Sequence, residues 1–205
     1  MKLLPFGEEI ILENDRVLLR PLEEQDIEHL LTFALNEPDL WQYSLMQGGG
    51  KENMQNYLSH ALSKRKSEDS YPFIVLDKEH QKYAGSTRFY DYQKNHNTVQ
   101  LGFTWYGKAF QGTGLNKNCK LLLLRYAFEE LEVERVEFRA DNNNKRSIAA
   151  MKSIGCIEEG VLRSNCAAHG NARRDSIVLS ILKDEWNSGV KERLIHKINA
   201  ESGDK

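Results

Sequence analysis

The chain has few cysteines, little excess charge and no long apolar run, and each shortage argues against a class of protein. Its 205 residues include three cysteines, Cys119, Cys156 and Cys166, which are too scattered to form a metal cluster by themselves. An odd, sparse set of cysteines is typical of a reducing cytoplasm. The formal net charge of -2 gives no support to a nucleic-acid-binding surface. Apolar runs such as Leu121–Leu124 are far too short to cross a bilayer.

The amino-terminal segment Met1–Ile11 lacks the basic region and the long apolar stretch of a signal peptide. We therefore expect a cytoplasmic protein that has no membrane segment and binds neither a metal ion nor nucleic acid. A chain of this length suits a single domain with a sizeable core. We expect residues 1–13 to form an N-terminal extension, 14–186 the domain, and 187–205 a C-terminal helix and tail.

Hydrophobic periodicity predicts an α/β (α+β) domain, in which helices flank a mixed, mainly antiparallel sheet. Short polar turns join the three central strands into an antiparallel meander. The expected strands are 16–21, 71–76, 82–92, 98–105, 135–139, 156–163 and 175–182. Apolar stripes at helical spacing predict helices over 27–34, 54–62, 117–131 and 147–154, and a last helix from Glu185.

The chain is organised around a glycine-bearing loop that leaves a strand near Trp105 and opens a long helix. Gly112 and Gly114 let a ligand approach the backbone closely, and the first amides of the helix have no internal partner. With the helix dipole they predict an anion site, most naturally for phosphate, and a plain strand-to-helix turn is the alternative. The residues after Gly114, Leu115 and Asn116, disfavour an ATP-binding P-loop, and a lysine at position 117 disfavours a dinucleotide-binding loop.

This loop resembles the coenzyme A loop of the GNAT family of acyl-CoA-dependent N-acetyltransferases. Ala109 stands where many members carry Gln or Arg, a departure that is common in the branch resembling ribosomal-protein-alanine N-acetyltransferases. The resemblance to this branch runs from about Asn14 to Leu194, nearly the whole chain. It rests on the order and spacing of Gly102–Trp105, Asn116 with Lys120–Glu129, Arg135–Phe138, Asn144-x-x-Ser147, Gly155, Glu159–Arg163, Arg174-Asp175 and Glu185-Trp186.

The resemblance implies that acetyl-CoA is the acyl-donor cosubstrate. Phe103, Thr104 and Trp105 would lie on a splayed strand whose backbone pairs with the pantetheine arm. Asn144 would bond the pantetheine chain, or serve only as a helix N-cap. Ser147, one helical turn on, is the candidate to protonate or stabilise the departing thiolate, with a purely structural role as the alternative. The residues that would hold the pyrophosphate are Gln111, Gly112, Thr113, Gly114, Leu115 and Asn116.

Acetyl transfer needs a neutral amine, a hydrogen bond to the developing oxyanion and, in most cases, a general base. Backbone amides near Phe103–Trp105 are the expected oxyanion donors. Many relatives carry Glu where this chain has Gln100, whose amide cannot accept a proton at neutral pH. Substitutes by residue type, each more readily explained as a surface residue, are Asp91, His96, Glu137 and His169. If the amine arrives neutral, proximity alone suffices.

The expected acceptor is a primary amine, on a protein N-terminus or on a small molecule. The segment Asp39–Gly50 would cover the acceptor side of the cleft, although its aromatic residues also suit a core. Three arginines, Arg163, Arg173 and Arg174, either pair across the last hairpin, which is the favoured interpretation, or steer an acidic acceptor. The exposed last strands are the expected surface of a homodimer. A catalytically weak CoA-binding sensor is the alternative function, and a nucleotide-phosphate enzyme is a distant third.

Overall fold

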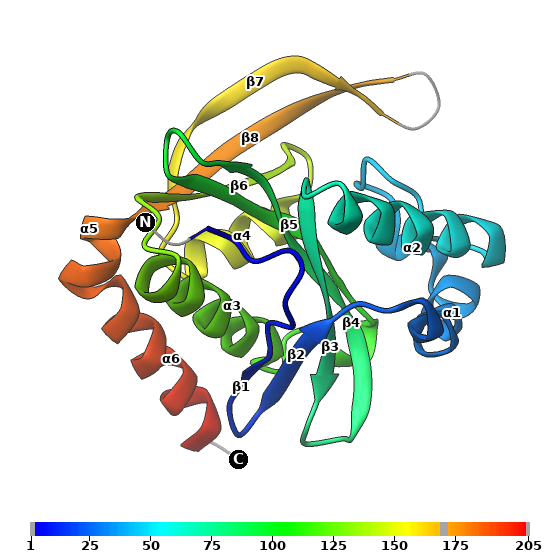
Figure 1. Cartoon of the computed structure of the whole chain (residues 1–205), viewed down its shortest axis with the longest axis horizontal. Helices are drawn as coiled ribbons and strands as arrows, with labels where there is room; N and C mark the ends of the chain where they lie inside the picture. Colours follow the sequence, from blue (N-terminus) through cyan, green and yellow to red (C-terminus); the bar gives the residue numbers. More distant parts are fainter. Residues whose placement is uncertain (1–2, 169–171, 204–205) are drawn as a thin grey trace.

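The computed structural model describes residues 3–168 and 172–203 of the chain. In this part, eight strands form one sheet in the order β1-β2-β3-β4-β5-β6-β8-β7 (Figure 1). β5 and β6 run parallel, whereas the other neighbouring strands run antiparallel. The strands are β1 Leu12–Glu13, β2 Val17–Pro21, β3 Ser70–Asp77, β4 Lys82–Gln93, β5 Thr98–Tyr106, β6 Arg135–Asp141, β7 Ile157–Ala167 and β8 Arg173–Leu182.

The helices lie in two layers on either side of the sheet. α1 and α2 pack against each other on one side, and α3, α4 and α6 lie on the other (Figure 1). The helices are α1 Ile27–Asn36, α2 Lys51–Lys66, α3 Leu115–Arg125, α4 Lys145–Ser153, α5 Lys183–Glu185 and α6 Lys191–Gly203. Turns of 3-10 helix occupy Glu24–Asp26, Pro38–Trp41 and Lys108–Phe110, and turns of π-helix occupy Tyr126–Glu130 and Trp186–Val190.

The middle strands pack against both helix layers. On β4, the guanidinium of Arg88 lies 5.0 Å from the ring centroid of Tyr57 in α2, whereas the next residue, Phe89, packs against Tyr126 after α3. Successive side chains of a strand point to opposite faces, so the two layers cover opposite faces of the sheet. Burial on both faces also explains why Phe73–Val75 in β3 is a continuous apolar run.

The predicted fold class and the predicted order of the elements are confirmed. The structure adds the short edge strand β1, and it ends α3 at Arg125, where the π-helical turn continues the helix. It also lengthens β7 and β8 into a hairpin that extends past the body of the sheet (Figure 1). Sequence patterns miss this extension because alternation marks a strand with one buried face, and β7 is exposed along nearly its whole length.

Candidate active site

The sheet opens between its parallel strands, β5 and β6. Their ladder runs from the pair Thr98 and Arg135 to the pair Gln100 and Glu137. Beyond it the strands continue without pairing to each other, so their backbone groups on the facing edges are left for another partner. An open strand edge of this kind can accept an extended ligand as an added strand.

A β-bulge turns the backbone of β5 at this opening. In the ladder between β4 and β5, the register shifts so that one residue of β4 faces Phe103 and Thr104. Phe103 has a φ of 49°, which is rare for a bulky side chain. The hydroxyl of Tyr57 donates to the carbonyl of Phe103 at 3.3 Å and supports this conformation. Backbone strain of this kind is concentrated at functional sites.

A cavity of about 390 Å³ lies at the opening, within the usual range of ligand pockets. It reaches both faces of the sheet, because Phe138 of β6 and its neighbour Arg139 point to opposite faces and both line it. On what we call the α3 side, its lining includes Gln111, Gly112, Asn116, Lys120, Asn144, Arg146 and Ser147. On what we call the α2 side, it includes Tyr43, Ser44, Tyr90, Arg139, Asp141 and Arg174.

The loop before α3 forms one end of the α3 side. Gly112 and Gly114 have φ angles of 76° and 81°, which glycine adopts without steric cost. The first hydrogen bond of the helix joins the amide of Asn118 to the carbonyl of Gly114, so the amides of residues 115–117 have no acceptor within the helix. An ideal Cβ built on Gly112 has no atom within 4 Å, so the space beside the loop is open. These features match the predicted phosphate site.

The six predicted pyrophosphate residues divide into two groups. Gln111, Gly112 and Asn116 line the cavity. Thr113 and Gly114 instead border a neighbouring hollow, and the side chain of Leu115 is buried in the core. Because the predicted contacts use backbone amides, the burial of a side chain does not exclude its amide. The role of the loop therefore stays a prediction.

Arg146, in the first turn of α4, places a positive charge beside this loop. Its guanidinium donates to the side-chain carbonyl of Gln111, whose amide donates to the carbonyl of Tyr106 at 2.8 Å. A guanidinium beside exposed backbone amides suits a phosphate group. The sequence analysis missed Arg146, although its place two residues after Asn144 within a recognised motif could have indicated it.

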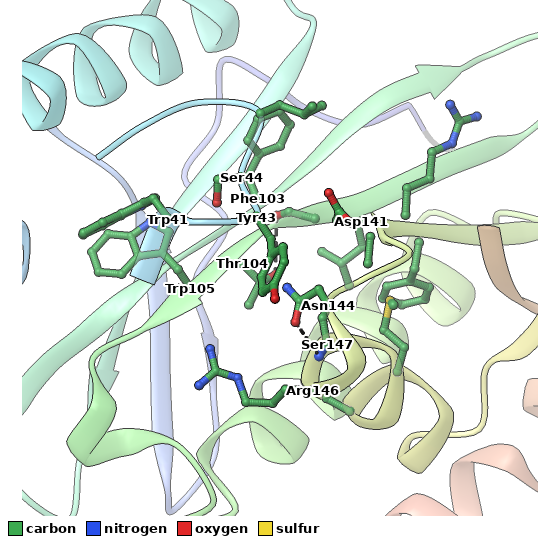
Figure 2. Close-up of a pocket in the computed structure, with 18 of the residues that line it drawn as sticks. Trp41, Tyr43, Ser44, Phe103, Thr104, Trp105, Asp141, Asn144, Arg146 and Ser147 are labelled. Carbon is green, nitrogen blue, oxygen red and sulfur yellow. Dashed lines mark hydrogen bonds between the residues drawn. The ribbon is translucent and has the colours of Figure 1, made fainter. Parts of the chain in front are cut away.

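Asn144 caps α4 and also lines the cavity. Its Oδ1 accepts the amide of Ser147 at 3.1 Å, which is the predicted N-cap bond. Figure 2 shows both residues across the cavity from Thr104. The cap uses the carbonyl oxygen of Asn144 and leaves its NH₂ group to donate to a ligand. The cap is confirmed, whereas the ligand role of Asn144 and the catalytic role of Ser147 stay predictions.

A buried lysine lies between α3 and β5. Nζ of Lys120 donates to Oγ1 of Thr104 at 2.9 Å, and Thr104 shares a second hydrogen bond of 2.7 Å with Thr87. Among the described residues, no carboxylate forms an ion pair with Lys120, and burial lowers the pKa of this lysine to about 8. Burying an unpaired ammonium is unfavourable, so its presence indicates a function. The sequence analysis missed it because a lysine in a helix reads as a surface residue.

The α2 side of the cavity carries charged and hydroxyl groups. Among the described residues that line the cavity, Asp141 has the only carboxylate. Arg139 lies two residues before it on β6 and donates to Glu137 at 2.7 Å. Burial raises the pKa of Tyr90 to about 12, so its phenol is protonated at neutral pH and can donate a hydrogen bond. These groups suit a polar ligand.

The segment Asp39–Gly50 contributes both to the core and to the cavity wall. Trp41 is fully buried and packs against Trp105, with ring centroids 4.9 Å apart. Gly48 is required beside it, since an ideal Cβ there would lie 2.4 Å from the indole of Trp41. Both interpretations of this segment are therefore correct for different residues. Those that line the cavity after Trp41 are Tyr43, Ser44, Leu45 and Met46 (Figure 2).

The general bases suggested by residue type do not line the cavity. Gln100 does, and its amide donates at 2.6 Å to Asp91, an exposed residue near the end of β4. His96 is exposed in the following turn. Glu137 accepts hydrogen bonds from two arginines and is occupied by them. Among the described lining residues, these three are absent, and His169 lies outside the described residues.

The arginines of the last hairpin have different surroundings. Nε of Arg173 donates across the hairpin to Ser164 at 3.1 Å, as cross-strand pairing predicts. Arg174 points to the other face, lines the cavity and donates to Ser176 at 3.0 Å on its own strand. Cross-strand pairing is therefore the wrong interpretation for Arg174, because successive strand residues alternate between faces.

A split parallel strand pair, a bulge and a glycine loop that opens a helix define an acyltransferase of the CoA-binding type. Residues 16–157 match the model of the acetyltransferase (GNAT) domain, and the chain belongs to this family. The protein is therefore an acetyltransferase. The matched residues lie within the predicted domain 14–186, whose bounds stay a prediction. Among the described residues, no helix combines the length and the apolar character that crossing a membrane requires.

Relatives of known sequence or structure agree with this assignment. A Bacillus subtilis (strain 168) protein named "Putative ribosomal N-acetyltransferase YdaF" is 25% identical over 189 residues, covering 84% of this chain and 94% of its own. The structure of a "putative acetyltransferase" from T. thermophilus is 32% identical, with a TM-score of 0.82 and coverage of 91% and 96%. A GCN5-related N-acetyltransferase from Brucella melitensis is 24% identical and shares the fold, with a TM-score of 0.85 and coverage of 95% and 87%.

Proposed function

We propose that the chain moves the acetyl group of acetyl-CoA directly to a primary amine while both substrates are bound. The observation that carries this proposal is the cavity at the β5–β6 opening, which joins the two faces of the sheet. The α3 side presents backbone amides and cationic groups, and the α2 side presents a carboxylate. A donor and an acceptor that enter from opposite faces would meet beside the bulge at Phe103.

The α3 side suits acetyl-CoA, the donor that the family generally uses. The open space beside Gly112, the amides that start α3 and the guanidinium of Arg146 suit the pyrophosphate. The NH₂ group of Asn144 and the unpaired edge of β5 suit the amides of the pantetheine arm. Amides near Phe103–Trp105 would donate to the oxyanion, and the hydroxyl of Ser147 to the departing thiolate.

The proton of the amine needs an acceptor, and Asp141 is the best-placed group. One oxygen of its carboxylate accepts the amide of Asn143 at 2.8 Å, which fixes the side chain and leaves the second oxygen for the substrate. In this scheme, the amine nitrogen bonds the acetyl carbon, the carbon–sulfur bond breaks, and Asp141 takes the proton that the nitrogen loses. Gln100 holds the place of the relatives' glutamate but cannot take this proton.

Calorimetric titration with acetyl-CoA, with ATP as control ligand, tests the donor site. Gly112→Asp should weaken binding about 100-fold, because a carboxylate would enter the open space intended for phosphate. Gly112→Asn is the matched control, since both residues tolerate a positive φ and only one adds charge. Equal affinities of the two variants, or no binding by the wild type, would contradict the proposal.

Release of free CoA then tests the acceptor. A relative's name refers to ribosomal acetylation, which supports a protein N-terminus as the acceptor, and a small amine is the other candidate. Peptides with free and blocked N-termini should be compared with small primary amines of matched charge. Binding of acetyl-CoA without amine-dependent CoA release would instead support the sensor alternative.

A further inference from the structure

Arg174 lies buried in the wall of the α2 side. The residue is 7% exposed, and its guanidinium lines the cavity. Its Nε donates to Ser176 at 3.0 Å and its Nη1 to the carbonyl of Tyr43 at 3.4 Å, both neutral acceptors. Among the described residues, its Nη2 has no hydrogen-bond partner, and no carboxylate forms an ion pair with it. A buried guanidinium therefore keeps donors available toward the cavity.

The charges around Arg174 do not explain its burial. Arg139 faces it from β6 and is itself paired with Glu137. Asp141 attracts it from the same strand, beyond the 4.0 Å of an ion pair. Tyr90 faces it from β4 with a protonated phenol. Burial also lowers the pKa of Arg174, as desolvation without an adjacent anion requires, and a guanidinium stays charged at neutral pH.

A structural role in the hairpin does not need this arrangement. The neighbouring Arg173 bridges the hairpin from an exposed position, without loss of hydration. Burying a charge without a partner is unfavourable, whereas an arginine that binds a carboxylate with two donors regains that free energy. The observations fit a guanidinium that receives its anion from the substrate.

We propose that Arg174 binds a carboxylate of the acceptor, so that the enzyme acetylates amines that carry a carboxylate close to the amino group. The proposal rests on the proposed function and names its substrate class. Asp141 would hold the ammonium end of such an acceptor, and Tyr90 would add a hydrogen bond to its carboxylate (Figure 2 shows Asp141 at the cavity). The carboxylate can belong to a free amino acid or to an acidic residue that follows a peptide N-terminus.

Matched acceptors test this inference. Alanine and alaninamide form one pair, and peptide amides that begin Ala-Asp and Ala-Asn form the other, so the two sources of the carboxylate are separated. In at least one pair, the acid should exceed the amide about 10- to 100-fold in kcat/KM, as expected for a charge-assisted bidentate contact. Arg174→Gln should abolish this preference, mainly through KM. Arg173→Gln removes the same charge one residue away and should leave the preference unchanged.

Equal use of acid and amide in both pairs by the wild type would overturn the inference, as would a preference that survives in Arg174→Gln while acetyl-CoA still binds. If Arg174→Gln does not fold, inhibition of the wild type decides. Simple carboxylates should compete with the amine and not with acetyl-CoA, and their uncharged amides should not compete. Failure of the proposed function is distinguishable, because no amine would then release CoA, and the inference would fail with it.

Discussion

The two sides of the cavity differ in what they present to a ligand. The α3 side is made largely of backbone, with the glycine loop, the first amides of α3 and the open edge of β5. The α2 side is made of side chains from distant parts of the chain, among them Tyr43, Asp141 and Arg174. Backbone can bind a donor common to many proteins, whereas side chains can be exchanged to suit one acceptor. The comparison predicts that substitutions on the two sides affect different kinetic parameters.

The largest effect should follow from Asp141→Asn on the α2 side. If this carboxylate takes the amine proton, kcat should fall about 10²- to 10³-fold at neutral pH, the usual contribution of a general base. The asparagine keeps an oxygen that can accept the amide of Asn143, so the turn should stay folded. Steady-state kinetics and calorimetry with acetyl-CoA should show a lower kcat with unchanged donor affinity. A loss of donor affinity with little change in kcat would contradict the assignment.

The second effect concerns stability on the α3 side. The pKa of Lys120 in the folded chain is about 8 and below its ordinary value of 10.5, so the unfolded chain binds more protons between these pH values. Stability should therefore rise as the pH increases from about 8 to about 10.5. Below pH 8 the buried ammonium costs about 3 kcal/mol of unfolding free energy.

Lys120→Met should remove this penalty. Denaturant unfolding at pH 7 should show a more stable variant, and the difference from the wild type should vanish toward pH 10.5. Lys117→Met is the control, since Lys117 pairs with Glu201 at the surface and should leave the pH dependence in place. A wild type whose stability does not rise over this pH range would show that Lys120 is not desolvated.

A smaller effect is expected at Asn144, where the cap and the ligand site coincide. Asn144→Ala should lower stability by about 1 kcal/mol through loss of the cap. It should also weaken acetyl-CoA binding about tenfold, because the NH₂ donor is lost. Asn144→Asp retains a cap acceptor and has no NH₂ group, so it should keep stability and still bind acetyl-CoA weakly. Normal binding by both variants would leave Asn144 as a cap only.

The same comparison explains how much of the molecule could be predicted from sequence. Backbone sites leave a local trace, so Gly112, Gly114 and Asn144 were identifiable from short motifs, and the sheet followed from periodicity. Arg174 and Lys120 carry no such trace, since each resembles an ordinary surface residue until the fold buries it. The bulge at Phe103 was also invisible, because it depends on register with β4.

The smallest effect tests whether Ser147 takes part in the chemistry at all. If its hydroxyl donates to the departing thiolate, Ser147→Ala should lower kcat about three- to tenfold, the value of one ordinary hydrogen bond. The α4 cap uses only the backbone amide of Ser147, so stability should not change. Ser153→Ala on the same helix is the control, because Ser153 donates to the carbonyl of Ala150 at 2.7 Å away from the cavity. Acyl donors with more acidic thiols should reduce the loss, since such leaving groups need less stabilisation, and an unchanged kcat would assign Ser147 to the fold.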